Sequence, residues 1–486
     1  MTDTHDYLER RWWALALLCM TQFMVVLDAS IVNIALPTIG DALDFSQDDL
    51  SWVVNAYVLT FGGFLLLGGR LADLLGRRRV FMAGLILFAL ASLAGGFAQN
   101  DVQLIIARAV QGLGAAIVSP AALSIITVTF REGAERNKAL GAWGAVAGSG
   151  GAVGVLLGGV LTESLGWEWV LWVNVPIGLA AAAIAPRLIA ESHSEAENRS
   201  FDIPGAVTIT GGLSLLVYAI VNAEKAGWGS TETIVLLAIA AALIAAFVAI
   251  ERRSPAPLVP FRIFRLPTLT GANAVGLLIG AALFSMFFFA SLYMQQVLGY
   301  GAIKAGISYL PLSAGIIISA AFSSQLSTRI GFKPVLVAGC VLMAIALVWW
   351  SQISPDGSYV SDILGPSVVA AIGLGLGFVA ITIAAVAGVS EHESGLASGL
   401  INTSQQVGGA LGLAILATIA NSVTDDKLAG ATTPAEQGAA LTDGFQQAFL
   451  AGAGFAVLAL ILCLTLIRTS DSRAMVDREA AERVGA

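Results

Sequence analysis

Asp28 is the residue whose chemistry stands out first, because its carboxylate interrupts an apolar run. The run from Trp12 to Pro37 is long enough to cross a bilayer and holds no other charged side chain. A charged group at such a position costs free energy, and groups of this kind mark ion or substrate pathways. Asp28 is therefore the first candidate for a coupling or binding site.

Arg108 is a second charge inside an apolar run, and we expect it at the same depth as Asp28. Asp28 precedes Pro37 by nine residues, and Arg108 follows Asp101 by seven. At the helical rise, both lie about 10–14 Å below the outer boundary of the bilayer. Burial disfavours the ionised form of a carboxyl group, whereas a nearby arginine favours it. The group can therefore gain or lose a proton when the cavity opens to the other side of the membrane. A permanent ion pair, or an Arg108 held by backbone carbonyls, is the alternative, but we favour coupling to a proton or another cation.

A polar turn between the second and third apolar runs is a candidate conformational gate. Asp73 can face a helix N-terminus or a cation, and Gly76 permits a tight turn. Such a cluster can hold two helix bundles together on the cytoplasmic side, although its basic residues also fix orientation. The gate prediction comprises Gly69, Arg70, Asp73, Gly76, Arg77 and Arg78.

The composition indicates a polytopic helical membrane protein. Of the 486 residues 57% are hydrophobic and only 12% are charged, against about 25% charged residues in soluble domains. The net charge of −8 sums loops on both sides of a membrane, so it carries little information about partners, and we expect no nucleic-acid partner. The three cysteines fall in apolar runs, and no nucleophile–base pair, metal-ligand cluster or phosphate-binding loop occurs. We expect no enzymatic activity, no ATP hydrolysis, no cofactor and no metal.

Apolar runs predict an all-α protein of fourteen transmembrane helices, arranged as six, two and six. With the N-terminus inside, the external loops carry only Lys225, Lys304 and Lys427, as the positive-inside rule requires. Both termini are then cytoplasmic. The predicted divisions are a six-helix bundle (1–190), two extra helices with cytoplasmic linkers (191–267), a second six-helix bundle (268–468) and a cytoplasmic tail (469–486). The proline-rich segment Glu251–Pro267 cannot be a continuous helix, and Asn421–Phe445 is expected to be a long outer loop.

Several motifs resemble those of the major facilitator superfamily. The turn at Gly69–Arg79 resembles its cytoplasmic loop motif, and Arg108–Gly114 resembles its arginine motif, which is linked there to proton transfer. Leu27–Pro37 looks like the signature of the fourteen-span drug/proton antiporter branch, and Asn402–Gly409 is similar to that branch as well. The resemblance covers essentially the whole chain. It implies the major facilitator fold and multidrug efflux.

The fifth apolar run departs from the antiporter pattern. Val155 stands where the antiporter motif usually has proline, which weakens the case for antiport. Small residues also let membrane helices approach one another closely, whatever the direction of transport. The motif's glycines are present as Gly150, Gly154, Gly158 and Gly159.

Substrate contacts are harder to predict than the charged pair. An aromatic cavity wall would suit lipophilic cations, although packing explains any one aromatic residue equally well. Polar side chains in or beside the runs could bond to a substrate or to a neighbouring helix. The candidates are Asn55, Gln111, Phe284, Phe288, Tyr293 and Gln405.

These observations predict a proton-coupled exporter of lipophilic, often cationic, drugs that works by alternating access. The alternative is an exporter of a lipid or endogenous metabolite with weak or no proton coupling. A membrane-embedded sensor or scaffold is disfavoured, because the sequence holds no sizeable soluble partner-binding region. We expect a monomer in the bacterial cytoplasmic (inner) membrane, with protons, a small-molecule substrate and the lipid bilayer as its partners.

Overall fold

The computed structural model describes residues 10–45, 50, 52–131, 133–192, 202–254, 257–390, 393–428 and 433–485. Most of the polar segment predicted at Glu191–Asp202 therefore lies outside the described residues. The part of the chain that is described is helical and contains no strand, which confirms the all-α prediction. Helices satisfy every backbone hydrogen bond within one segment, as a bilayer demands.

The first group of helices precedes residue 190. Its members are α2 (Arg11–Ala42), α4 (Trp52–Leu75), α5 (Arg77–Gly96), α6 (Asp101–Thr129), α7 (Ala134–Ser164), α8 (Trp169–Trp172) and α9 (Asn174–Leu188). Two further helices follow, α10 (Ile203–Ala226) and α11 (Thr231–Glu251).

The second group begins after a short 3₁₀ turn, η1 (Phe261–Arg265). Its members are α12 (Pro267–Leu292) with its π-helical end η2 (Tyr293–Val297), α13 (Ala302–Ser308), α14 (Leu310–Ile330), α15 (Phe332–Trp350), η3 (Tyr359–Leu364), α16 (Gly365–Val386), α17 (Ser394–Leu428) and α18 (Pro434–Leu466). A terminal helix, α19 (Thr469–Gly485), ends the described chain.

Thirteen of the described helical segments are long and apolar enough to cross a membrane. Within α7 the described residues also contain a shorter apolar segment, Val153–Ser164. The total of fourteen spans, the cytoplasmic termini and the domain boundaries stay predictions.

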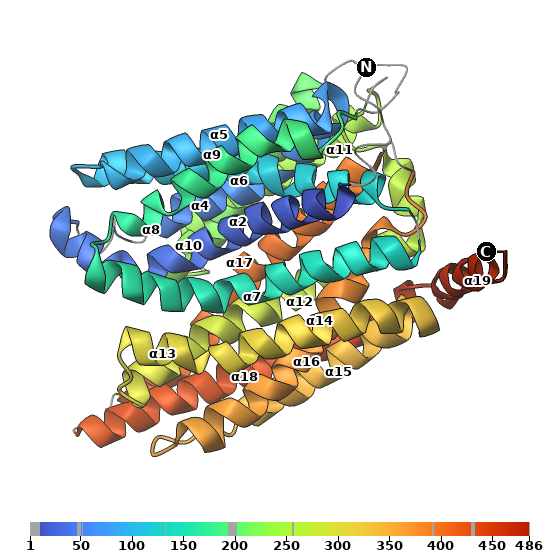
Figure 1. The fold of residues 1–486 in the computed structure, drawn as a ribbon. Coiled ribbons are helices and arrows are strands. Elements are labelled where there is room, and N and C mark those ends of the chain that lie inside the picture. Colours follow the sequence, from blue (N-terminus) through green and yellow to red (C-terminus); the bar gives the residue numbers. More distant parts are fainter. Residues whose placement is uncertain are drawn as a thin grey trace.

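The helices pack as two groups that meet along α7 and α17 (Figure 1). In the first group α6 packs against α4 and α5, and α2 packs against α7. In the second group α12 packs against α17 and α18, and α16 packs against α14 and α15. The groups touch where α7 lies along α14 and where α17 lies along α4, while α10 contacts both α4 and α17.

The structure agrees with the sequence prediction for the linker after α11 but not with that for the segment between α17 and α18. The proline-rich linker is confirmed as non-continuous: α11 ends at Glu251, whose carboxylate accepts hydrogen bonds from the backbone amides of Leu258 (3.0 Å) and Val259 (3.1 Å). The expected long outer loop at Asn421–Phe445 is wrong. There α17 continues to Leu428 and α18 begins at Pro434, so most of that segment is helix.

Candidate functional site

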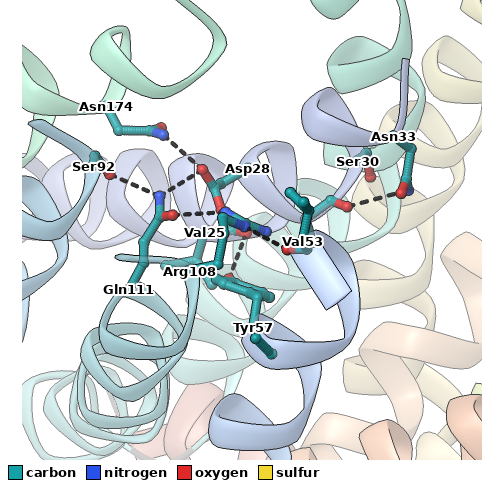
Figure 2. Close-up of polar contacts among 12 residues, drawn as sticks. Val25, Asp28, Ser30, Asn33, Val53, Tyr57, Ser92, Arg108, Gln111 and Asn174 are labelled. Carbon is teal, nitrogen blue, oxygen red and sulfur yellow. Dashed lines mark hydrogen bonds and ion pairs between the residues drawn. The ribbon is translucent and has the colours of Figure 1, made fainter. Parts of the chain in front are cut away.

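Asp28 lies on α2 with none of its surface exposed, and three side chains donate to its carboxylate (Figure 2). Arg108 Nη1 on α6 lies 2.6 Å from Asp28 Oδ2. Gln111 Nε2 and Asn174 Nδ2 donate to Oδ1 at 2.6 Å and 2.7 Å. The contact expected from matched depths is therefore present, and the carboxylate joins α2, α6 and α9.

Arg108 is itself held on several sides, with 1% of its surface exposed. Its Nε donates to the Val53 carbonyl at 3.0 Å, and its Nη1 also donates to Gln111 Oε1 at 2.6 Å. The guanidinium lies over the Tyr57 ring, 4.4 Å from the ring centroid, in cation–π geometry. Tyr57 in turn donates from its hydroxyl to the Val25 carbonyl at 3.2 Å. The arginine therefore keeps backbone, amide and aromatic partners apart from the carboxylate.

Local sequence explains how these side chains meet. Gln111 follows Arg108 by three residues, so both lie on one face of α6. The side chain of Asn100 caps that helix by accepting from the Gln103 amide at 3.0 Å. A break after α8 makes Asn174 the first residue of α9.

The sequence predictions missed Asn174, Tyr57 and Ser92. Ser92 on α5 accepts from Gln111 Nε2 at 2.7 Å and so holds the amide that reaches Asp28. A single amide inside the apolar stretch after Val170 was the available signal for Asn174. Nothing comparable marked Tyr57 or Ser92, because tyrosine and serine are common in such helices.

The predicted glycines of α7 lie against α2 beside Asp28. A Cβ on Gly154 would lie 2.9 Å from the Leu27 carbonyl oxygen, and one on Gly158 would lie 2.7 Å from that of Ile31. A Cβ on Gly150 would lie 2.9 Å from the Val26 side chain. Gly159 is buried on the same helix, and Val155 is partly buried. The glycines thus bring the backbone of α7 close to the helix that carries the acid.

The predicted gate residues meet both a cation and a helix N-terminus. Asp73 is fully buried, and Arg77 Nη2 lies 2.8 Å from its Oδ1. Arg77 Nε also donates to Ser124 Oγ at 2.7 Å. The other oxygen, Asp73 Oδ2, accepts from the Leu396 amide in the first turn of α17 at 3.2 Å. One carboxylate therefore joins α4 and α5 to a helix of the second group.

The rest of the gate motif shapes the turn. Gly76 has a backbone φ of +108°, which residues other than glycine rarely adopt. Arg78 donates from Nη1 to the Ile189 carbonyl at 3.1 Å and from its backbone amide to Glu191 Oε1 at 3.1 Å. Gly69 is buried and Arg70 is half-buried on α4.

The six predicted substrate contacts belong to different clusters. Gln111 is part of the Asp28 network, and Asn55 is half-buried on α4. Tyr293 is fully buried, with its hydroxyl 2.7 Å from the Ser354 carbonyl and 2.8 Å from Asp362 Oδ2. Its contacts hold the end of α12 to the segment before α16.

The remaining three candidates lie on α12 and α17. Phe284 and Phe288 are each 41% exposed, and the Phe284 ring lies over Gly409 of α17. The backbone of Gln405 packs on Gly280, where a Cβ would lie 2.3 Å from the Gln405 carbonyl oxygen. Phe284 and Gln405 thus lie at the contact between α12 and α17, whereas the contact recorded for Phe288 is with the Phe289 ring of its own helix.

A cavity of about 810 Å³ opens between the end of α7 and the segment from η2 to α14. Apolar and aromatic side chains such as Ile307, Pro311 and Tyr300 line it, together with the charged residues Glu163 and Lys304. None of its lining residues is among the six predicted substrate contacts. On α2, by contrast, the exposed Asn33 and the half-buried Ser30 follow Asp28 along the helix (Figure 2).

Solved structures share this fold. The human organic anion transporter MFSD10 superposes with a TM-score of 0.67 at 14% identity, covering 94% of this chain and 99% of that one. The proton:xylose symporter XylE superposes with a TM-score of 0.65 at 12% identity, covering 96% of this chain and 97% of that one. At such low identity the likeness concerns the fold alone.

Sequence comparisons identify the family. The cephamycin export protein of Amycolatopsis lactamdurans is 42% identical over 89% of this chain and 88% of its own. The puromycin resistance protein of Streptomyces alboniger is 38% identical over 98% of this chain and 94% of its own. The tetracenomycin C resistance and export protein of Streptomyces glaucescens is 33% identical over 87% of this chain and 79% of its own. The Major Facilitator Superfamily model matches residues 18–413. The chain is therefore a member of the major facilitator superfamily, a family of multi-pass membrane transporters and not of enzymes, and its relatives include antibiotic export and resistance proteins.

Proposed function

We propose that this transporter exports lipophilic drugs, often cationic ones, in exchange for protons. The observation that carries the proposal is the fully buried Asp28 carboxylate, which pairs with Arg108 at 2.6 Å. Relatives named for the export of cephamycin and tetracenomycin C, and for resistance to puromycin, support the direction and the substrate class. No phosphate-binding loop is present in the sequence, so an ion gradient is the energy source that we propose.

Protonation of Asp28 is the proposed coupling event. A neutral carboxyl group no longer attracts Arg108, whose guanidinium keeps the Val53 carbonyl, Gln111 and the Tyr57 ring as partners. Because the carboxylate joins α2, α6 and α9, a proton there changes the contacts among three helices at once. A coupling ion must stabilise one conformation of the transporter more than the other, and these changed contacts would do so.

The drug, in this proposal, binds apart from Asp28. Arg108, Gln111 and Asn174 occupy the carboxylate oxygens, and the side chain has no exposed surface. Proton and drug then act on each other through the helices that separate them. Phe284, Phe288, Asn55 and Gln405 stay the proposed drug contacts, and the uncharged Asn33 joins them.

The gate works, in this proposal, by locking the end of the molecule where α4 meets α17. The bond from the Leu396 amide to Asp73 must break before the two groups can separate there. Arg77 holds the Asp73 carboxylate in place for that bond. Separation at this end would admit drug from the cytoplasm.

The membrane arrangement completes the proposal. The first turns of α2 and α7 lie together, since Arg11 and Glu135 form an ion pair at 2.7 Å. Asn137 of α7 also donates to Thr328 at the end of α14 at 3.0 Å. We place this end in the cytoplasm, with fourteen spans, both termini inside, and a monomer in the bacterial cytoplasmic membrane.

Export of a lipid or endogenous metabolite without tight proton coupling is the second candidate. Val155, in place of the proline usual in antiporters, is the observation in its favour. Drug-dependent proton release from purified protein in weakly buffered detergent solution separates the two. A coupled antiporter releases protons when puromycin or ethidium binds, and release disappears in Asp28→Asn. An uncoupled exporter releases none while it still binds the compound.

A further inference from the structure

Asn174 carries a polar atom that the Asp28 network leaves unused. The residue is fully buried, and its Nδ2 donates to Asp28 Oδ1 at 2.7 Å. Its other amide atom, Oδ1, is buried and has no hydrogen-bond partner within the described part of the chain. An unpaired buried carbonyl oxygen costs free energy, so its presence beside a titratable group calls for a reason.

The two protonation states of Asp28 need different neighbours. An ionised carboxylate only accepts hydrogen bonds, whereas a protonated one must also donate one. Arg108 has no acceptor atom. Gln111 Oε1 already accepts from Arg108, and Gln111 Nε2 is shared between Asp28 and Ser92. Among the three side chains that donate to Asp28, Asn174 is therefore the one with an acceptor atom, Oδ1, that has no partner among the described residues.

An asparagine amide can serve both states. Its nitrogen and oxygen are nearly identical in size, so a half-turn of the amide exchanges donor and acceptor without new volume. In a close-packed interior this is a low-cost rearrangement compared with moving a helix. Asn174 opens α9, so its side chain reaches Asp28 from a different helix (Figure 2).

We propose that Asn174 is a positioning residue for the proton step. Its amide donates to ionised Asp28 and, after turning over, accepts the hydrogen bond of protonated Asp28. The inference rests on the proposed function, because it assumes that Asp28 takes up the proton. Because Asn174 is the first residue of α9, a change in the protonation of Asp28 on α2 also changes the contact between these two helices.

The other groups around the carboxylate do not supply this exchange. Arg108 from α6 and Tyr57 from α4 are the ionisable side chains that contact the pair among the described residues. Tyr57 donates its hydroxyl to the Val25 carbonyl, away from the acid. From α7, the glycine backbone at Gly154 faces the Leu27 carbonyl.

Infrared difference spectroscopy between high and low pH tests the proposal on the full-length protein in detergent. The wild type should show a carboxyl band from protonated Asp28 together with a side-chain amide band that titrates with it. In Asn174→Leu, which keeps the size and removes the amide, the amide band should vanish. The carboxyl band should move to the higher frequency of an acid that lacks an acceptor. Proton-driven transport should fall about tenfold, the effect of one hydrogen bond to a charged group, with counterflow retained.

A matched control is Asn273→Leu on α12. Asn273 is also buried, donates to the Leu269 carbonyl at 2.9 Å and accepts from Ser404 Oγ at 2.9 Å, with no part in the Asp28 network. It should leave both bands unchanged. Should Asn174→Leu fail to fold, ¹³C-labelled asparagine in the wild-type protein gives the same information, because the titrating amide band must shift with the label.

The outcomes separate this inference from the proposed function. A carboxyl band that vanishes in Asp28→Asn but has the same frequency in wild type and Asn174→Leu overturns the role of Asn174 alone. A titrating amide band that does not shift with the asparagine label also overturns the role of Asn174 and assigns the band to Gln111. Absence of any Asp28-dependent carboxyl band between the two pH values overturns the proton site itself.

Discussion

At the scale of single residues, the account depends on how completely Asp28 is enclosed. Its three donors come from two helices besides its own, and its exposed surface is nil. A carboxylate so enclosed cannot neutralise a charge on the drug directly. In the proposed exchange, a single coupling acid carries one proton inward, which balances the outward movement of a monocation but leaves the second charge of a dication unbalanced.

Substrate charge should therefore matter. In proteoliposomes with an imposed pH gradient, we expect the monocation ethidium to be exported about tenfold faster than its dicationic analogue propidium, or more. The two compounds share an aromatic body, which isolates the effect of charge. Collapsing the gradient with an ionophore provides the control. Equal proton-driven export of both would show that a second acid compensates the charge.

The charged members of the site were predictable from sequence, and the neutral members were not. Asp28 and Arg108 stand out because ionised groups in apolar runs are costly. Asn174 and Ser92 are polar but uncharged, so each is as easily explained by helix–helix bonding. Their relation to Asp28 depends on helices that lie far apart in the sequence and is set by packing.

At the scale of helices, the contact between α2 and α7 positions the acid. The α7 glycines let its backbone approach the carbonyls of Leu27 and Ile31, next to Asp28 in the chain. Added volume at this contact would displace α2 and with it the carboxylate. Hydropathy predicted most of these helices, because membrane spans are long and apolar. It failed at Asn421–Phe445, since α17 and α18 continue beyond the apolar stretch, and hydropathy reports where the bilayer ends and not where a helix ends.

Gly158→Ala tests the importance of this contact. The new Cβ would lie 2.7 Å from the Ile31 carbonyl oxygen, so we expect a loss of about 1–3 kcal/mol in stability from overpacking. Thermal unfolding of the purified protein, followed by intrinsic fluorescence, measures it. Gly454→Ala on α18, where a Cβ meets nothing within 4 Å, should be neutral or slightly stabilising. Equal melting temperatures for the two variants would contradict the close approach of α7 and α2.

At the scale of the whole molecule, two groups of helices meet at the gate and along α7 and α14. Motifs predicted the gate chemistry, since Asp73 meets both a cation and a helix N-terminus. The sequence did not predict that α10 would contact α4 and α17 together. Hydrophobic patterns identify which helices cross the membrane, but complementary side-chain shapes decide which helices become neighbours.

Transport by Asp28→Asn in proteoliposomes is the most direct test of the central claim, that Asp28 carries the coupling proton. The variant keeps the size of the side chain and removes its ability to ionise. The account predicts that counterflow exchange of ethidium or puromycin continues near the wild-type rate, while accumulation driven by a pH gradient is lost. Accumulation at the wild-type level would contradict it and place the coupling proton elsewhere.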